Sequence, residues 1–473
     1  MPQLTGFPSV AIPGPKAIPL LGHLPRVIQF FEDPVGALTS LRKYGDIVAV
    51  TRDSPSLVCV FGPERNREVL GNPAGFRHDE DFIQAQPGTP LSRIRRVIVC
   101  MNGDEAKRHR RLMAPAFSRS TLESYADEMV RVSEAVVARW PRDQVVDVDA
   151  LLRDLALSVA VRALFGIDIV GGATEMGEVA GEFGIALTQP LAILLPYDLP
   201  GTPFRRAQRL AARLLGQLEL VIENKRRGVE VEHDALALLL RANADDEAGF
   251  DDDELIAETV TLLFAGHETM AKTLSWTMFL LDRHPAVLAD VLDELDGVLG
   301  GRPVSAADLP NLPLLERVMK ESMRVLTPVP TLFLRVPATD TALGRHTLPM
   351  GANVVVSPYA THHDPELYPQ PRRFMPERWE GLKPTPFEYM PFGAGARICI
   401  GAAFAQQAVR LMLATVLQRT RIAVVRDAKI SRLTRANIMM PRFGIQAHIQ
   451  APHRKRLKVE PIRGDIGELV ELR

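Results

Sequence analysis

The chain has 473 residues, of which 46% are hydrophobic and 24% charged, and its formal net charge at pH 7 is −1. These values are those of a folded, water-soluble protein and exclude a global positive field that would favour nucleic acid or an anionic membrane. The three cysteines, Cys59, Cys100 and Cys399, are too few and too dispersed for a disulfide framework or a CxxC zinc site, which fits a reducing, cytoplasmic location. Prolines interrupt the apolar N-terminus, which is therefore too short to span a membrane.

The predicted elements alternate between a few short strands and many helices. Residues 46–61 hold two β-branched runs around a turn, a pattern typical of a β-hairpin. Between about residue 104 and residue 300, apolar residues recur at intervals of three and four positions, which indicates helices. Short extended pieces return at 334–357 and after 420. The sequence therefore predicts a mainly α fold with a small β region assembled from distant parts of the chain.

The longest predicted helix covers residues 252–284, between an acidic start and Pro285. Its middle, TLLFAGHETMAKTLSW, is apolar around most of its circumference, as in a helix buried in a large core. Residues 266–269, Gly-His-Glu-Thr, interrupt this stretch. Because a helical glycine costs about 1 kcal/mol relative to alanine and a buried carboxylate costs more unless paired, we predict a reaction site at this position.

The stretch FGAGARICIG, residues 392–401, places Cys399 just before a predicted helix over residues 400–419. Its glycines allow tight turns and the close approach of a flat molecule. The free N–H groups of the helix favour a negative sulfur, which predicts a lowered pKa for the Cys399 thiol and a role as nucleophile or metal ligand. A dinucleotide fingerprint is excluded because the third glycine is missing, and the loop itself supplies no histidine base.

This stretch resembles the haem-binding loop FxxGxRxCxG of the cytochrome P-450 superfamily of haem-thiolate monooxygenases, with all five fixed positions present. The resemblance implies that Cys399 is the proximal iron ligand, where a thiolate favours O–O cleavage. AGHET, residues 265–269, is similar to the family's (A/G)Gx(D/E)T, which implies that Glu268 and Thr269 relay protons to dioxygen. The implied cofactor-binding set is Cys399, Phe392, Gly393, Arg397, Arg110, Arg335 and Ala265.

Three further segments carry the resemblance. GDEAKRHRRLMAPAF is similar to the family's propionate-binding helix and places Arg110 on a haem propionate, whereas the position four residues earlier, commonly Trp or His, is Ala106. Arg335, which follows TPVPTLFL, resembles another propionate partner. An ExxR at residues 321–324 precedes PERW and then the cysteine loop, in the family's order, and implies a structural ion network of Glu321, Arg324 and Arg378.

The resemblance implies a pocket for a small apolar substrate, formed by residues at about 80–102 and 185–200, by the central helix and by residues 329–333. The candidates are Val329, Thr331, Leu332, Phe333, Leu191, Ile193, Leu194 and Leu195. Such a lining suits a terpenoid, fatty acyl, steroid or polyketide-like molecule. The run RIRR, residues 93–96, either meets a substrate anion or forms a solvated loop.

The resemblance covers most of the chain and implies one haem-thiolate monooxygenase domain over residues 1–450, followed by a charged C-terminal tail, residues 451–473, which we expect to be solvated. It implies haem b, dioxygen and electrons from a ferredoxin or flavodoxin with its reductase, because the chain has no flavin or iron–sulfur motif of its own. We expect a cytoplasmic monomer that hydroxylates or epoxidises its substrate. A haem-thiolate peroxygenase, isomerase or dehydratase and a non-catalytic haem sensor remain alternatives.

Overall fold

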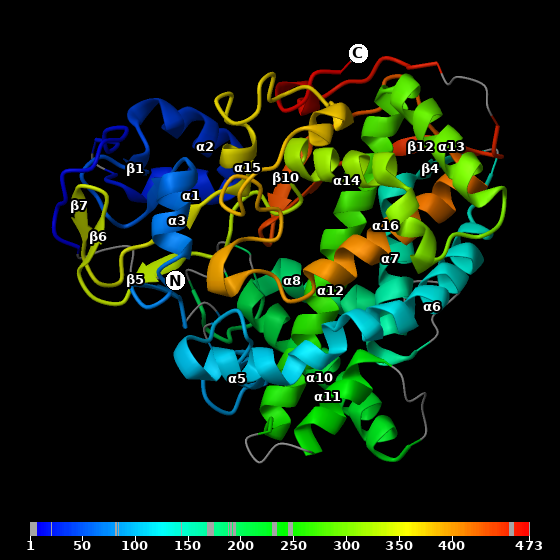
Figure 1. The fold of residues 1–473 in the computed structure, drawn as a ribbon. Coiled ribbons are helices and arrows are strands. Elements are labelled where there is room, and N and C mark those ends of the chain that lie inside the picture. Colours follow the sequence, from blue (N-terminus) through cyan, green and yellow to red (C-terminus); the bar gives the residue numbers. More distant parts are fainter. Residues whose placement is uncertain are drawn as a thin grey trace.

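The structure is a computed structural model. It describes residues 7–19, 21–80, 83, 85–142, 144–167, 175–187, 189, 192, 195–228, 234–244, 249–453 and 458–472. Long helices fill most of the molecule, and several short strands gather at one side, where N-terminal segments meet residues 335–356 (Figure 1). The prediction of a mainly α fold with a small β region is therefore confirmed.

Helices make up most of the secondary structure. Several of them begin at a proline, because proline fixes a helical φ angle and lacks an N–H that the first turn could not use. The α-helices are α1 (Leu24–Glu32), α2 (Pro34–Leu41), α3 (Pro63–Leu70), α4 (Pro90–Ile94), α5 (Gly103–Met113), α6 (Arg119–Val137), α7 (Val148–Phe165), α8 (Glu175–Leu187), α10 (Pro203–Arg226), α11 (Ala235–Ala244), α12 (Asp252–Arg283), α13 (Pro285–Leu299), α14 (Pro313–Val325), α15 (Pro358–His362) and α16 (Ala402–Arg419).

The strands are short and form small sheets. They are β1 (Ile47–Ala49), β2 (Val58–Val60), β3 (Phe76–His78), β4 (Val145–Asp147), β5 (Arg335–Pro337), β6 (Thr341–Leu343), β7 (His346–Leu348), β8 (Val354–Val356), β9 (Arg421–Val424), β10 (Arg432–Arg435), β11 (Ile438–Pro441) and β12 (Gln446–Gln450).

The largest sheet has the order β1-β2-β8-β5-β3 and joins distant parts of the chain. β1 and β2 pair antiparallel, with Ile47 opposite Val60, which confirms the predicted hairpin. β2 then pairs in parallel with β8, and β5 pairs antiparallel with β3 so that His78 lies opposite Arg335. This last pairing brings a segment before α5 beside the segment that follows α14.

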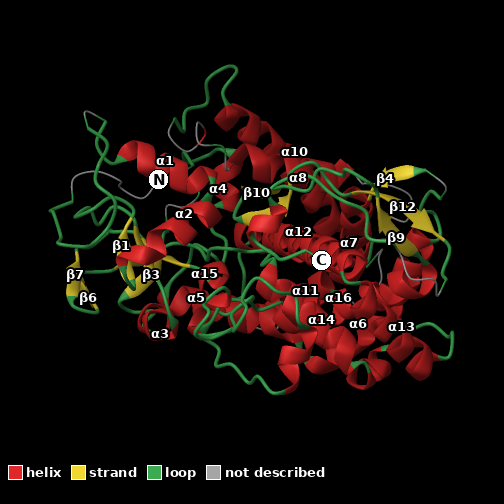
Figure 2. Ribbon diagram, turned by 90° about the horizontal axis from the view of Figure 1, so that it is seen from above, coloured by secondary structure: helices red, strands yellow, loops and turns green. Residues whose placement is uncertain are grey.

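Helix α12 runs through the interior of the helical part, where α7, α14 and α16 pack against it (Figure 2). Asp251 caps its N-terminus: the Asp251 carboxylate accepts from the Glu254 N–H, and the Glu254 carboxylate accepts from the Asp251 N–H. Such reciprocal bonds satisfy donors that a helix start leaves free. Trp276 and most other side chains of the helix are buried, so the prediction of a long buried central helix is confirmed. Within the described ranges, no helix combines the length and apolar character needed to cross a bilayer.

The C-terminal segment does not behave as the solvated tail that its charged composition predicts. Within the described residues 458–472, the side chains of Ile466, Leu469 and Val470 are buried in the main core. The backbone is also held, because the Arg463 N–H donates to Ala428 O at 2.9 Å. The expectation of a solvated segment was wrong here, since three apolar side chains are enough to anchor a short polar stretch.

Leu469→Ala should lower the free energy of unfolding by about 2 kcal/mol or more, because it removes a buried side chain and leaves a cavity. Urea denaturation of the full-length protein measures the change. Lys458→Ala, in the same segment, is the control and should shift stability by less than about 0.5 kcal/mol. Equal stability of both variants would show that the segment does not contribute to the core.

Candidate active site

Cys399 lies in a loop whose glycines have a clear steric reason. Gly393 and Gly395 have φ angles of 73° and 71°, which favour glycine. A Cβ on Gly395 would lie 2.2 Å from Leu70 O, so only glycine lets the loop approach the end of α3. The Cys399 N–H donates to Phe392 O at 2.9 Å and closes the loop just before α16 begins. The half-buried Phe392 packs against the main core and fixes the other end of the loop.

The thiol of Cys399 is accessible to solvent although surrounding protein desolvates it. Burial raises the pKa of this thiol, whereas the Gly401 N–H and the charge of Arg110 act to lower it. The predicted lowering of the pKa was therefore wrong, because desolvation outweighs the helix N-terminus and the nearby cation. A metal ion that binds the sulfur supplies the positive charge that favours thiolate, so this environment fits a metal ligand better than a free nucleophile.

Three arginines of the predicted cofactor-binding set act on one another electrostatically although they come from separate elements. The Arg335 guanidinium is buried on β5 and donates to Phe333 O at 3.0 Å, while the Arg397 guanidinium donates to Ile98 O. Burial and the charge of Arg397 lower the pKa of Arg335 to about 10. Burial, followed by the charge of Arg110, lowers the pKa of Arg397.

These three cations form no ion pair with a carboxylate among the residues that the structure describes. Mutually repelling, partly desolvated arginines are costly unless a ligand brings negative charge to them. Two carboxylates on one flat ligand would compensate them, and the glycine loop beside them leaves room for its approach. The residues present therefore fit a haem with its two propionates.

The motif at the middle of α12 combines a hydroxyl, an acid and a small residue. The half-buried Thr269 donates from Oγ1 to Ala265 O at 2.8 Å, and Ala265 is exposed although it belongs to a largely buried helix. A Cβ on Gly266 would lie 2.9 Å from Leu164 Cδ1, so close packing of α7 explains this glycine. The exposed Ala265 and the hydroxyl of Thr269 give α12 an accessible position with a polar group in its apolar middle.

Glu268 is held as a carboxylate by two basic neighbours. Its Oε1 lies 3.6 Å from His267 Nε2, and its Oε2 lies 3.8 Å from Lys272 Nζ. Burial acts to raise the pKa of Glu268, but the close contact with His267 and the charge of Lys272 lower it to about 2. Lys272 is itself anchored by Asp149 of α7 at 2.8 Å. The acid is therefore ionised at neutral pH and can pass protons on but not store them.

Glu321, Arg324 and Arg378 form the ion network that the sequence predicted. Arg324 donates two bonds of 2.9 Å to the Glu321 carboxylate, and both side chains are fully buried. Arg378 Nε and Trp379 Nε1 each donate to the same carboxylate, also at 2.9 Å. The remaining guanidinium donors of Arg324 reach backbone carbonyls, including His362 O. Since every strong donor has a partner inside the protein, the network has a structural role.

Residues 329–333 lie beside the cysteine loop: a Cβ on Gly393 would be 3.8 Å from Leu332 Cδ2. Val329 is half-buried and Phe333 is exposed. Two hydrogen bonds join Thr331 to Asn437, whose side chain accepts from the Thr331 hydroxyl and donates to the Thr331 carbonyl. No sequence motif marks Asn437, whose φ angle of 62° places it at the turn between β10 and β11.

Other predicted pocket positions are less informative. Leu191, Ile193 and Leu194 lie outside the described residues, and Leu195 is exposed. In the RIRR run, Arg93 pairs with Asp253 and Glu219 at 2.6 Å. The charge of Arg93 is therefore compensated within the protein, and Arg93 does not require a substrate anion as a partner.

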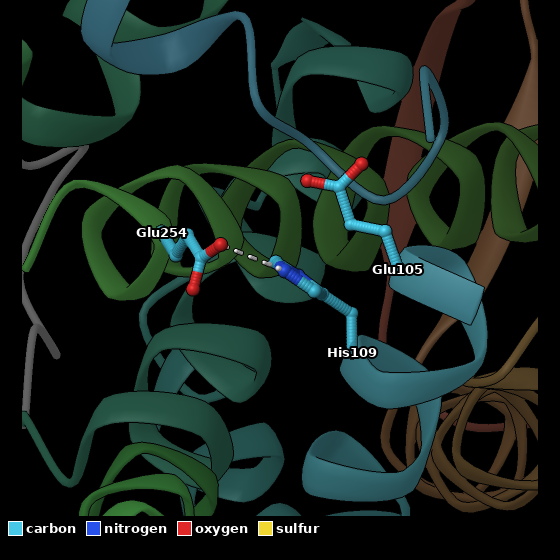
Figure 3. Close-up of side chains that lie close together, drawn as sticks. All are labelled: Glu105, His109 and Glu254. Atoms are coloured by element: carbon cyan, nitrogen blue, oxygen red, sulfur yellow. Dashed lines mark ion pairs between the residues drawn. The ribbon is translucent and has the colours of Figure 1, made fainter. Parts of the chain in front are cut away.

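Glu105, His109 and Glu254 bring possible metal-binding atoms within 4.8 Å of one another, from α5 and α12 (Figure 3). However, Arg96 and Arg108 both donate to Glu254 at 2.5 Å. His109 Nδ1 lies 2.8 Å from the carboxylate of Glu258, also on α12 (residues 252–283). The cluster is thus an electrostatic tie between two helices, and it holds α5, with Arg110 on it, against α12.

The fold and this site together define a haem-thiolate protein, and comparison with known proteins identifies the family. The family model for cytochrome P-450 matches residues 12–448. The chain therefore belongs to the cytochrome P-450 family and is a haem-dependent monooxygenase that acts on an apolar organic substrate. Membership implies a haem-iron cofactor and the use of dioxygen and a redox partner.

Several relatives are known by name. The chain is 34% identical over 87% of its length to cyclooctat-9-en-7-ol 5-monooxygenase of Streptomyces melanosporofaciens, covering 89% of that protein. It is 32% identical over 92% of its length to pentalenene oxygenase of Streptomyces avermitilis, covering 96% of that protein. The solved structure of retinoic acid bound cyanobacterial CYP120A1 matches 94% of the chain and 100% of its own, with a TM-score of 0.80 and 24% identity, and so supports the fold.

Proposed function

We propose that this enzyme hydroxylates or epoxidises a cyclic terpenoid and that Cys399 is the thiolate ligand of its haem b. The observation that carries the haem assignment is the exposed Cys399 near arginines that form no ion pair with a carboxylate among the described residues. The terpenoid assignment rests on two relatives, whose names state that they act on cyclooctat-9-en-7-ol and on pentalenene. The first name is that of an unsaturated alcohol and the second that of an unsaturated hydrocarbon, so both molecules have few polar groups, as an apolar pocket requires.

In this proposal Cys399 Sγ would ligate the iron, and the guanidinium groups of Arg110, Arg335 and Arg397 would bind the propionates. Gly393 and Gly395 would let the loop adopt the tight turns that place Cys399 for the haem, and Phe392 would hold the loop in place. When bound, the haem supplies the activation of dioxygen and the transfer of one oxygen atom to the substrate. Ala265, which is exposed, leaves space for the cofactor and the substrate at the middle of α12.

Glu268 and Thr269 would deliver the protons that reduction of dioxygen to water consumes. The Thr269 hydroxyl sits at the accessible face of α12 and can accept a proton-carrying hydrogen bond at Oγ1 while it donates to Ala265 O. Glu268, which His267 and Lys272 keep ionised, can take a proton from the solvent side and release it at once, because its pKa of about 2 disfavours retention. Lys272, tied to Asp149, positions this carboxylate.

We further propose that a ferredoxin or flavodoxin with its reductase supplies the electrons and that the enzyme is a cytoplasmic monomer. The experiment is turnover of the purified holoenzyme with ferredoxin, its reductase and NADPH, on a panel of cyclic terpenoids with fatty acids as comparison. We expect one atom of isotopically labelled dioxygen in a terpenoid product. Product formed only with hydrogen peroxide would favour a peroxygenase, and product without oxygen incorporation would favour an isomerase or dehydratase.

Thr269→Ala should leave electron consumption largely intact but lower the product formed per NADPH by roughly tenfold or more, because positioned proton transfer contributes about 10²–10⁴-fold. The measurement compares NADPH oxidation, peroxide and product in one assay. Thr273→Ala is the matched control: this buried hydroxyl, one turn further, bonds to Thr269 O at 2.9 Å. If the product formed per NADPH is unchanged in Thr269→Ala, or is lowered equally in both variants, Thr269 does not relay protons.

A further inference from the structure

His78, at the end of β3, is a buried histidine that its neighbours hold in one orientation. Its backbone N–H donates to Asn102 Oδ1 at 2.9 Å, and the Asn102 amide donates back to His78 O at 3.0 Å. Its ring Nδ1 lies 2.6 Å from Val99 O. Since only 8% of the residue is exposed, the ring has little freedom to turn.

The other ring nitrogen, His78 Nε2, is buried and has no hydrogen-bond partner among the residues that the structure describes. A carbonyl oxygen can only accept, so the short contact with Val99 O places a proton on Nδ1. Nε2 is then either a bare acceptor or, in the imidazolium form, a charged donor. A buried polar atom without a partner is costly, which points to a ligand that is not part of the chain.

The surroundings of His78 show which charge such a ligand carries. His78 lies opposite Arg335 in the β3–β5 ladder. Burial, then the charges of Arg335 and Arg397, lower the pKa of His78 to about 2. Both guanidinium groups belong to the set for which the described residues offer no paired carboxylate. A ligand with carboxylates would compensate the arginines and would also stabilise the imidazolium, whose Nε2–H could donate to it.

We propose that His78 is a haem-binding residue that donates from Nε2 to a propionate together with Arg335 and Arg397. This assignment rests on the proposed placement of the haem against Cys399. Ala106, a small buried residue, occupies the α5 position where the family commonly has Trp or His, and it cannot donate a hydrogen bond to a propionate. The proposed role of His78 compensates for this loss. The hydrogen-bond donor that α5 lacks is thus supplied by His78 on β3.

His78→Phe should accelerate transfer of ferric haem to an excess of an apo-globin by roughly tenfold or more, because it removes a charge-assisted hydrogen bond. It should also shift the midpoint potential of the haem downward, since the loss of positive charge near the propionates favours ferric iron. His78→Gln keeps an N–H donor and should restore part of the retention. Where His78→Phe does not fold, His78→Leu is the second apolar variant.

His363→Phe is the control for loss of a buried histidine, because His363 Nε2 also has no hydrogen-bond partner among the described residues, while its Nδ1 lies 3.0 Å from Tyr359 O in a different part of the molecule. This variant should retain haem as the wild type does. A wild-type haem-transfer rate and potential in His78→Phe would overturn the assignment of His78. A wild-type protein without the spectrum of thiolate ligation would instead overturn the haem placement itself, so the two failures are distinguishable.

Discussion

Cys399→Ser should give a folded protein that lacks the absorption band of thiolate ligation in its reduced carbon monoxide complex and has lost essentially all monooxygenase activity. A serine hydroxyl cannot replace a thiolate as an electron-donating axial ligand, and that donation is what favours O–O cleavage. The fold should survive, because the Cys399 side chain is exposed and its backbone bond to Phe392 O does not involve the sulfur.

The matched control is Cys100→Ala, since Cys100 is buried and its thiol pKa is raised to about 12, chiefly by burial. That variant should keep the wild-type spectrum and differ only in stability. The decisive measurement is the carbon monoxide difference spectrum of both variants beside the wild type. An identical spectrum in Cys399→Ser would remove this sulfur from the iron and with it the proposed mechanism.

Local sequence signals predicted the central helix and the hairpin well. Helix α12 ends within one residue of the predicted limit, because an acidic cap and Pro285 define its ends without help from the rest of the fold. The hairpin of β1 and β2 is equally local. The C-terminal segment was predicted wrongly because its average composition is polar, whereas burial depends on the three apolar residues that meet the core.

The site was only partly predictable, for a related reason. The spacing within AGHET and the cysteine loop revealed Glu268, Thr269 and Cys399. The raised pKa of Cys399 could not be predicted, because a helix N-terminus is visible in the sequence but desolvation by distant residues is not. His78 carries no motif of its own, and its interest arises only when strand pairing sets it opposite Arg335.

Arg324→Met should lower the free energy of unfolding by about 3–5 kcal/mol, enough to prevent accumulation of the protein at 37 °C, because it leaves the fully buried Glu321 carboxylate without its bidentate partner. The same change also removes the hydrogen bonds that the Arg324 guanidinium donates to the carbonyls of His362, Pro371 and Arg373. Arg378 and Trp379 still donate to Glu321, but one charged and one neutral donor cannot replace the two bonds that are lost.

Lys320→Met is the control on the same helix, since Lys320 pairs with Glu316 at 2.6 Å and both side chains are about one-third exposed. Partly exposed ion pairs contribute about 0–1 kcal/mol, so this variant should unfold near the wild-type urea concentration. Urea denaturation and soluble yield at two temperatures compare the pair. A structural role requires that Arg324→Met lose stability before haem is added. If its apoprotein were as stable as the wild type and only turnover fell, Glu321 and Arg324 would belong to the chemistry of the reaction and not to the scaffold.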